Sequence, residues 1–266
     1  MGGDGQDVGR GFDGGAGQYD DVLAHNRHGA RRLVAALPEG EWADVLDVGC
    51  GTGFVSEAMV ARFPVRRVTG VDPSEGMLEH YARRLAELPV EATAVRAGVL
   101  DMPVPDGAFD AVVSGMAFHW FRDKPAAVAA MARRLRPGGV LGILGSGRGS
   151  DRQLQLLMEA VRPPLPAAWT GVFDAIQRGA EDLAGYMRDA GLEVLDAWEE
   201  RRVRRVDPDA YMARIMAVSS HLSEGLDPAE AEAHGARVVQ AVHDAAGPDG
   251  FLYDFVKIYG VARRPG

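Results

Sequence analysis

Residues 45–53 read Val-Leu-Asp-Val-Gly-Cys-Gly-Thr-Gly, and Asp72 follows after enough chain for one helix and one strand. An apolar run that ends in alternating glycines is typical of a buried parallel strand leading into a tight turn. Because glycine has no Cβ, such a turn lets a ligand contact the backbone. An acidic residue at the end of the next strand is placed to bind both hydroxyls of a ribose. The segment therefore predicts a nucleoside site in an α/β fold.

The spacing of the glycines distinguishes between nucleoside-binding folds. A dinucleotide-binding turn has the pattern G-x-G-x-x-G, whereas this turn has Gly49, Gly51 and Gly53, with Phe54 at the position of the third glycine. This spacing argues against an NAD-dependent oxidoreductase. A phosphate-binding P-loop ends in Gly-Lys-Ser/Thr, which is not found here. The turn is therefore suited to a ligand without phosphates.

The glycine turn is one of four motifs that follow one another over residues 45–145. The other three are Gly70-Val-Asp-Pro-Ser-Glu-Gly-Met-Leu78, Phe109-Asp-Ala-Val-Val-Ser114 and Leu135-Arg-Pro-Gly-Gly-Val-Leu141. Together they resemble the motifs of class I S-adenosylmethionine (SAM)-dependent methyltransferases. The resemblance implies an α/β fold with a doubly wound, seven-stranded sheet, with SAM as the cofactor and S-adenosylhomocysteine (SAH) as the product.

Hydrophobic periodicity predicts the elements of this sheet and of its cover. Residues 1–18 are rich in glycine and are expected to be mobile, and residues 19–266 are expected to form the methyltransferase domain. An N-terminal helical lid and a helical insertion before the last strand are expected to close over the carboxyl ends of the strands. Helical cover is expected near 19–37, 148–190 and 207–246, and strands near 44–48, 66–71, 93–97, 109–114, 140–145, 192–204 and 252–262.

The resemblance also implies which residues contact SAM. The three glycines would let the backbone approach the methionine moiety, Asp47 would orient their loop, and Asp72 would bind the ribose. Met77 would lie near the adenine, although its spacing also fits core packing. The full set of expected cofactor residues is Asp47, Gly49, Cys50, Gly51, Gly53, Asp72, Pro73, Met77, Val99, Leu100, Asp101 and Ser114.

The adenine end of this expected site departs from the family pattern. The backbone N–H of Val99 would bond the adenine ring. Many relatives have a polar residue where this chain has Gly98 or Leu100. Asp101 is then the nearest candidate for a contact with the adenine amino group.

The segment from Ser114 to Phe121 follows the fourth expected strand, where the resemblance places the chemistry. Methyl transfer is an in-line displacement that depends on positioning and on exclusion of water. Tyr19, Phe118, His119 and Trp120 are expected to line the acceptor pocket, where aromatic faces attract a sulfonium. His119 is a candidate base for a hydroxyl or amine acceptor, or else a wall of the pocket. A carboxylate acceptor is ionised at neutral pH and would need no base.

Two resemblances bear on the acceptor. Residues 12–20 and the segment from Met116 to Trp120 are similar to those of malonyl-thioester O-methyltransferases of biotin synthesis, for which a buried Arg122 or Arg148 would bind the carboxylate. The segment from Phe118 to Phe121 equally resembles methyltransferases of bacterial secondary metabolism. We expect methyl transfer to a small molecule, either a secondary metabolite or a carboxylate. The alternatives are carboxyl O-methylation of a malonyl thioester and a non-catalytic SAM-binding protein.

Composition and charge bear on the partners of the chain. A net charge of −9 argues against nucleic acid, and no apolar stretch approaches the about 20 residues of a membrane helix. A single cysteine excludes an internal disulfide and is typical of a reducing cytoplasm. His25 and His28 alone make a poor metal site, so no metal is expected. The basic stretch from Arg201 to Arg205 is interpreted as a solvated strand edge, with docking of an acidic carrier protein as the alternative.

Two residue types are rare in this chain. Asn26 is the single asparagine, and Lys124 and Lys257 are the only lysines. This usage is typical of a GC-rich genome and indicates nothing about function.

Overall fold

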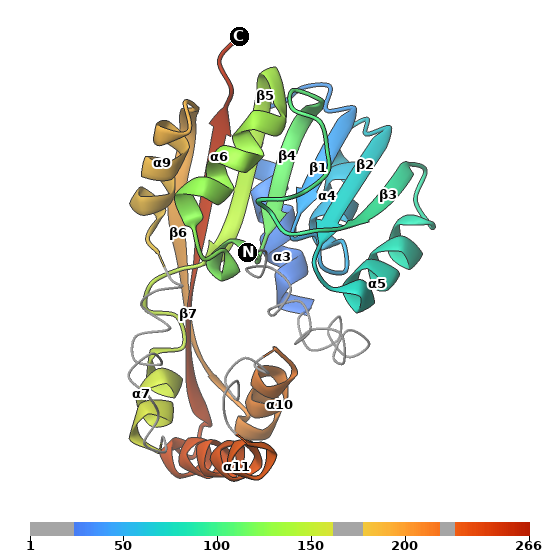
Figure 1. Ribbon diagram of the computed structural model, residues 1–266. Coiled ribbons are helices and arrows are strands. Elements are labelled where there is room, and N and C mark those ends of the chain that lie inside the picture. The colour runs from blue at the N-terminus through green and yellow to red at the C-terminus, as the bar shows by residue number, and fades with distance from the viewer. Residues whose placement is uncertain (1–23, 162–177, 219–226) are drawn as a thin grey trace.

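The computed structural model describes residues 24–161, 178–218 and 227–266 and centres on one seven-stranded sheet (Figure 1). The strand order is β3-β2-β1-β4-β5-β7-β6, in which the first five strands along the chain pair in parallel and β7 is antiparallel to both its neighbours. This is the doubly wound arrangement expected from the sequence. The strands are β1 (Asp44–Val48), β2 (Arg67–Asp72), β3 (Glu91–Arg96), β4 (Phe109–Gly115), β5 (Leu135–Ser146), β6 (Glu193–Val206) and β7 (Phe251–Arg263).

Helices cover both faces of the sheet. Apolar side chains of α3 (Ala24–Ala36), α4 (Phe54–Arg62) and α5 (Glu75–Leu85) pack on one face. Those of α6 (Lys124–Arg134) and α9 (Ala180–Asp189) pack on the other face (Figure 1). All five residues of β1 are buried, as expected for a central strand that is covered on both sides.

The strands β6 and β7 continue beyond the sheet as a two-stranded ribbon that carries a separate group of helices (Figure 1). These helices are α7 (Arg152–Ala160), α10 (Pro208–Val218) and α11 (Pro228–Ala245). They share an apolar cluster with the first residues of β7, and this cluster is distinct from the two clusters of the sheet. We call this group, residues 151–161, 207–218 and 227–256 as described, the cap. The helical insertion expected before the last strand is therefore present as α10 and α11.

A hydrogen bond ties two helices of the cap together. The hydroxyl of Tyr211 on α10 donates to Asp151, which precedes α7, over 2.7 Å. Asp151 has a left-handed backbone with φ of 51°. Its backbone N–H donates to the carbonyl of Asp254 on β7, so the start of α7 is fixed to the ribbon.

Among the strands, the start of β5 differs most from the sequence expectation. The strand expected near 140–145 begins at Leu135, directly after α6, although Pro137 and two glycines follow. Leu135 pairs with Phe109, and the register then shifts so that Val140 pairs with Ala111. The irregularity accommodates the Pro-Gly-Gly segment, which sequence patterns alone assign to a turn.

Some expectations lie outside the described residues, namely the mobile segment 1–18, Tyr19 and the first part of the helix expected near 19–37. In the part of the chain that the structure describes, no helix is long and apolar enough to cross a membrane.

Candidate cofactor and acceptor site

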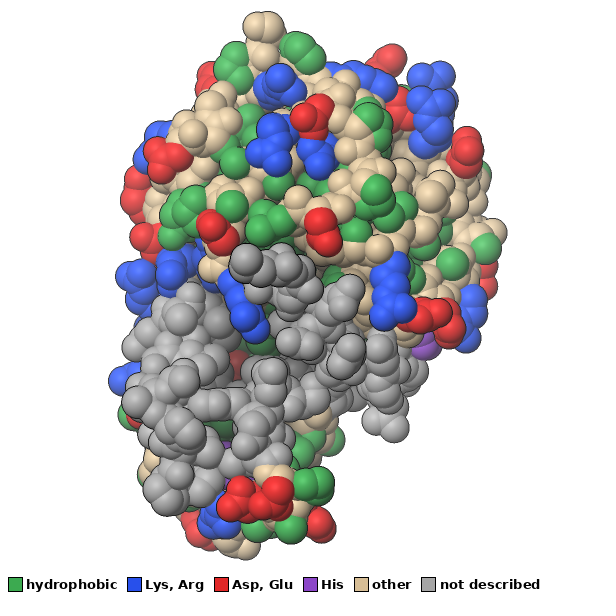
Figure 2. Space-filling model, in the orientation of Figure 1, with side chains coloured by type: hydrophobic (Ala, Val, Ile, Leu, Met, Phe, Trp, Pro, Cys, Tyr) green, Lys and Arg blue, Asp and Glu red, His purple; other side chains and the backbone are tan. Residues whose placement is uncertain are grey.

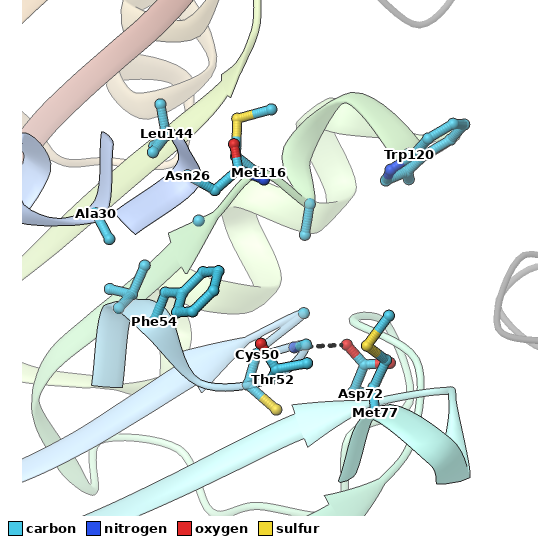
Figure 3. A pocket seen from close by; sticks show the side chains of 15 residues that line it. Asn26, Ala30, Cys50, Thr52, Phe54, Asp72, Met77, Met116, Trp120 and Leu144 are labelled. Atoms are coloured by element: carbon cyan, nitrogen blue, oxygen red, sulfur yellow. Dashed lines mark hydrogen bonds between the residues drawn. The ribbon is translucent and has the colours of Figure 1, made fainter. Parts of the chain in front are cut away.

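A pocket lies at the carboxyl ends of β1, β2 and β4, where ligands of open α/β sheets bind (Figure 3). It is formed by the glycine turn, the end of β2, the start of α3 and the segment after β4. Its lining residues are Asn26, Ala30, Gly49, Cys50, Gly51, Thr52, Phe54, Val55, Asp72, Met77, Gly115, Met116, Ala117, Trp120 and Leu144.

Two glycines of the turn have left-handed backbones that shape the pocket. Gly49 has φ of 66°, and a Cβ at this position would collide with Ala117. Gly51 has φ of 51°, and a Cβ there would meet no atom within 4 Å. A side chain at position 51 would therefore project into open space of the pocket. The absence of that side chain leaves room for a ligand beside the backbone.

Asp72 ends β2 and fixes the turn. Its Oδ2 accepts a hydrogen bond from Gly51 N over 3.0 Å, and its Oδ1 accepts one from Ser74 N over 2.9 Å. A carboxylate accepts about four hydrogen bonds, and this one lines the pocket. The arrangement is suited to a pair of ribose hydroxyls.

Asp47 lies behind the turn and is buried. Its Oδ2 accepts hydrogen bonds from Ser56 N over 3.2 Å and from Ser56 Oγ over 2.7 Å. Its Oδ1 has no hydrogen-bond partner among the described residues. Burial raises the pKa of Asp47 to about 7, with a further contribution from the nearby Asp72 charge. Burial also raises the pKa of the Cys50 thiol, so the turn disfavours negative charge next to the pocket.

The segment after β4 contributes an aromatic side to the site. Trp120 lines the pocket, and its ring centroid lies 4.9 Å from that of His119. Phe118 is fully buried in the apolar cluster under α6 and α9 instead of facing the pocket. Of the four expected acceptor residues, the pocket lining includes Trp120 but neither Phe118 nor His119, and Tyr19 is outside the described residues.

His119 is buried, and its ring orientation bears on its chemistry. Its Nδ1 accepts a hydrogen bond from the backbone N–H of Ser146, the last residue of β5, over 3.3 Å. A backbone N–H only donates, so Nδ1 carries no proton in this arrangement. The neutral ring then carries its proton on Nε2, where it acts as a donor.

The expected cofactor residues divide into two groups. Gly49, Cys50, Gly51, Asp72 and Met77 line the pocket. The others do not belong to that lining: Leu100 is 48% exposed, and Ser114 is fully buried with an Oγ that has no hydrogen-bond partner in the described chain. The residues outside the lining are Asp47, Gly53, Pro73, Val99, Leu100, Asp101 and Ser114. Their contacts with a cofactor stay predictions.

The structure adds Asn26 to the site, which the sequence patterns did not identify. Its side chain lines the pocket from α3 and is only 6% exposed. Its Oδ1 has no hydrogen-bond partner in the described residues. The one signal in the sequence was that this is the chain's single asparagine.

Met116 is a second addition and lies opposite Asp72 in the pocket (Figure 3). It has φ of 60°, a conformation that non-glycine residues rarely adopt. Its N–H donates to the carbonyl of Leu144 over 2.8 Å, which links the segment after β4 to β5. Backbone strain of this kind is common where a chain is held for binding.

The buried cations differ from those expected. Arg122 is exposed, and Arg148 is exposed and pairs with Asp182 over 3.0 Å. The two lysines are buried instead, with Lys124 2% and Lys257 6% exposed. Lys124 donates to the carbonyl of Phe121 over 2.9 Å, and burial lowers its pKa to about 8.

Lys257 on β7 reaches toward the pocket side of α3. A Cβ on Gly29 would lie 2.6 Å from its Nζ and 2.9 Å from Leu144, a residue of the pocket lining. Glycine inside a helix is destabilising by about 1 kcal/mol relative to alanine. Its presence at position 29 leaves room for the ammonium group.

The residues of the pocket fit SAM. Gly51 provides a space beside the backbone, Asp72 provides acceptors for a ribose, and Asn26 provides an unpartnered amide oxygen among the described residues. Nothing in the turn is suited to phosphates. The fold and this pocket together define a nucleoside-binding protein of the class I methyltransferase type.

Comparison with known proteins supports that class. Residues 45–139 match the family described as a methyltransferase domain. The trans-aconitate 2-methyltransferase of Deinococcus radiodurans is 38% identical over 47% of this chain and 46% of its own length. The malonyl-[acyl-carrier protein] O-methyltransferase of Hahella chejuensis is 37% identical over 50% of this chain and 47% of its own length. These two matches thus span about half of each relative.

A third relative matches over nearly its whole length. The nocamycin O-methyltransferase of Saccharothrix syringae is 31% identical over 96% of this chain and 98% of its own. The chain therefore belongs to the SAM-dependent methyltransferases, a family of enzymes that use SAM as the methyl donor.

Solved structures agree on the fold. The YcgJ protein of Bacillus subtilis covers 90% of this chain and 99% of its own, with a TM-score of 0.62 and 18% identity. The [4+2]-cyclase SpnF covers 90% of this chain and 80% of its own, with a TM-score of 0.58 and 21% identity. At these identities the likeness concerns the fold alone.

Proposed function

We propose that this protein transfers the methyl group of SAM to a carboxylate of a small molecule and releases a methyl ester and SAH. SAM, when bound, supplies an electrophilic methyl group on a sulfonium. A carboxylate oxygen of the acceptor attacks that carbon, and the electron pair of the breaking bond returns to the sulfur. The negative charge of the carboxylate and the positive charge of the sulfonium are both neutralised, and no proton moves.

The orientation of His119 carries the choice of a carboxylate over a hydroxyl or amine. Nδ1 of His119 accepts the hydrogen bond from Ser146 N–H. The proton of the neutral ring is then on Nε2, so Nε2 cannot accept a proton from the acceptor. A hydroxyl or amine acceptor would need a base, whereas a carboxylate needs only to be held. We therefore propose that His119 is not the base of the reaction.

Lys257 supports the same acceptor chemistry. It is a buried cation beside Leu144, at the carboxyl end of β5, and the helix that passes over it has a glycine at that point. A buried ammonium interacts strongly with an acceptor carboxylate because solvent screening is weak there. We propose that Lys257 binds this carboxylate, the role that the sequence patterns assigned to an arginine.

The names of two relatives agree with an anionic acceptor. They specify trans-aconitate and a malonyl group on a carrier protein. We propose further that Asp72 binds the ribose of SAM, that the glycine turn contacts its methionine moiety, and that the cap covers the acceptor.

A second candidate is carboxyl O-methylation of a malonyl thioester on an acidic carrier protein. The Hahella chejuensis relative favours it. The basic edge of β6 argues against docking of an acidic carrier protein, because its arginines already have partners within the chain. Arg201 pairs with Asp254, Arg204 stacks on the Tyr253 ring, and Arg205 donates to Gly250. Acidic and basic side chains also alternate over the visible face of the sheet core (Figure 2).

The test is transfer of labelled methyl from SAM to a panel of small di- and tricarboxylates and to a malonyl thioester. We expect the label to be released as volatile methanol by alkali, because methyl esters hydrolyse under these conditions. Label that resists alkali would contradict a carboxylate acceptor. Label confined to the thioester would establish the second candidate. SAM binding without turnover on any acceptor would favour a non-catalytic SAM-binding protein.

A further inference from the structure

We infer that Asn26 binds the amino-acid end of SAM, with its amide oxygen on the α-ammonium group and its amide N–H groups on the α-carboxylate. The inference rests on SAM as the cofactor. It assigns the methionine end of the ligand to a side chain of α3, outside the four motifs of residues 45–145.

The first observation is that a polar atom is buried without a partner. Asn26 is 6% exposed, and its Oδ1 makes no hydrogen bond to any described residue. Its neighbours in the pocket lining include Ala30, Phe54 and Leu144, which cannot satisfy an amide. Buried polar atoms without a partner are rare and costly in folded proteins. An amide at this position is explained if a bound ligand satisfies it.

The second observation is the place of Asn26 along the pocket. Figure 3 shows Asp72 and Met77 on one side, and Asn26 with Met116 on the opposite side. With the ribose at Asp72, the glycine turn lies between the two sides. A nucleoside at Asp72 extends one group toward the turn and one away from it. In SAM the group that extends from the 5′ carbon is the amino-acid chain, so this chain reaches the side of Asn26.

The chemistry of the amide matches that end of SAM. An asparagine side chain has one acceptor oxygen and two donor N–H groups, which complement an ammonium and a carboxylate on the same carbon.

The experiment compares two ligands that differ only in this end of the molecule. Calorimetric titration is performed with SAH and with 5′-methylthioadenosine, which has the nucleoside and sulfur but no amino-acid group. The proteins are the wild type, Asn26→Ala and Asn26→Asp, with Asp72→Ala as the matched control at the ribose side.

We expect Asn26→Ala to lower SAH affinity about 10-fold to 100-fold, because hydrogen bonds to charged groups are lost. Affinity for 5′-methylthioadenosine should stay within about twofold of the wild type. Asn26→Asp should bind SAH no better than Asn26→Ala, because its carboxylate repels that of the ligand. Asp72→Ala should weaken both ligands together.

Thermal unfolding of the ligand-free variants separates binding from folding. Because alanine removes an unsatisfied buried amide, Asn26→Ala should unfold at or above the wild-type temperature. Equal losses for the two ligands, or unchanged SAH affinity, would overturn the inference. A wild type that binds neither ligand would overturn the cofactor assignment itself, and a wild type that binds both ligands equally would overturn only the role of Asn26.

Discussion

The sheet core and the cap are built differently around the same ribbon of β6 and β7. The central parallel strands of the core are buried on both faces, and its pocket is shaped by backbone conformations such as those of Gly49 and Gly51. The cap has its own apolar cluster of helices on the end of the ribbon. Its shape is set by side-chain packing, which many sequences can satisfy.

The difference between the core and the cap indicates that the two regions have different functions. The family match covers residues 45–139, all of them in the core, and the first two relatives match over about half of their lengths. We propose that the core binds SAM and that the cap, together with Lys257 and the segment after β4, selects the acceptor. Variants that destabilise either the core or the cap, but not both, test whether SAM binding and acceptor selection are separate.

The largest effects should come from removing buried side chains in each region. Phe251→Ala in the cap and Leu85→Ala in the core both remove fully buried side chains, and each should lower the free energy of unfolding by about 3 to 5 kcal/mol. Leu85 packs where a Cβ on Gly53 would lie, so its loss should also weaken SAH binding. Phe251→Ala should leave SAH affinity unchanged and lower turnover. Urea unfolding measures the stability of the two variants, and titration with SAH measures their cofactor affinity. A loss of SAH binding in both variants would contradict separate roles for the core and the cap.

The buried carboxyl of Asp47 should make the stability of the core depend on pH. Its folded pKa of about 7 is above the usual value of 3.8, so the folded state holds its proton more tightly than the unfolded state. Stability is therefore lost as pH rises from about 4 to 7, by an amount of the order of 4 kcal/mol.

Asp47→Asn cannot ionise and should lack this loss. Unfolding free energies of the two proteins at pH 4 and pH 8 isolate the contribution, because all other groups are shared. Parallel pH profiles for wild type and variant would show that Asp47 titrates normally in the folded protein.

Asp72→Ala should lower SAH affinity about 100-fold, because charge-assisted hydrogen bonds to the ribose are removed. Glu79→Ala, an exposed change on the neighbouring α5, serves as the control and should have no effect. Calorimetry or equilibrium dialysis measures both. Unchanged affinity in Asp72→Ala would reject the ribose role of this residue.

Lys257→Met should have a smaller and more selective effect, about tenfold on kcat/KM for a carboxylate acceptor. SAH affinity should remain at the wild-type value because the change lies on the acceptor side. The matched control is Lys124→Met, in which the other buried lysine is replaced on the opposite face of the sheet. Equal losses in the two variants would indicate a general effect of removing a buried lysine.

Sequence patterns predicted the sheet, its helices and the centre of the site for clear physical reasons. A buried parallel strand, a left-handed turn and an acid at the next strand end are local requirements, so Gly49, Gly51 and Asp72 could be identified from spacing alone. The insertion before β7 was also visible, because its boundaries are marked by Asp-Pro and Gly-Pro pairs.

The residues that were missed depend on tertiary contacts. Asn26 is on a helix that has no motif, and only folding brings it to the turn. Lys257 lies within the apolar pattern of β7, where nothing local indicates a pocket. The opposite error occurred at Phe118, whose aromatic ring was expected in the acceptor pocket but packs under α6 and α9, because a short 3-10 helix at Phe118–Trp120 turns it inward.

The most direct test is a crystal structure of the protein with SAH. We expect the ribose hydroxyls on Asp72, the backbone of Gly51 against the thioether chain, and the amino-acid group within hydrogen-bond distance of Asn26. SAH with its amino-acid group at Asp72, or bound away from the glycine turn, would contradict the proposed orientation and with it the placement of the acceptor beneath the cap.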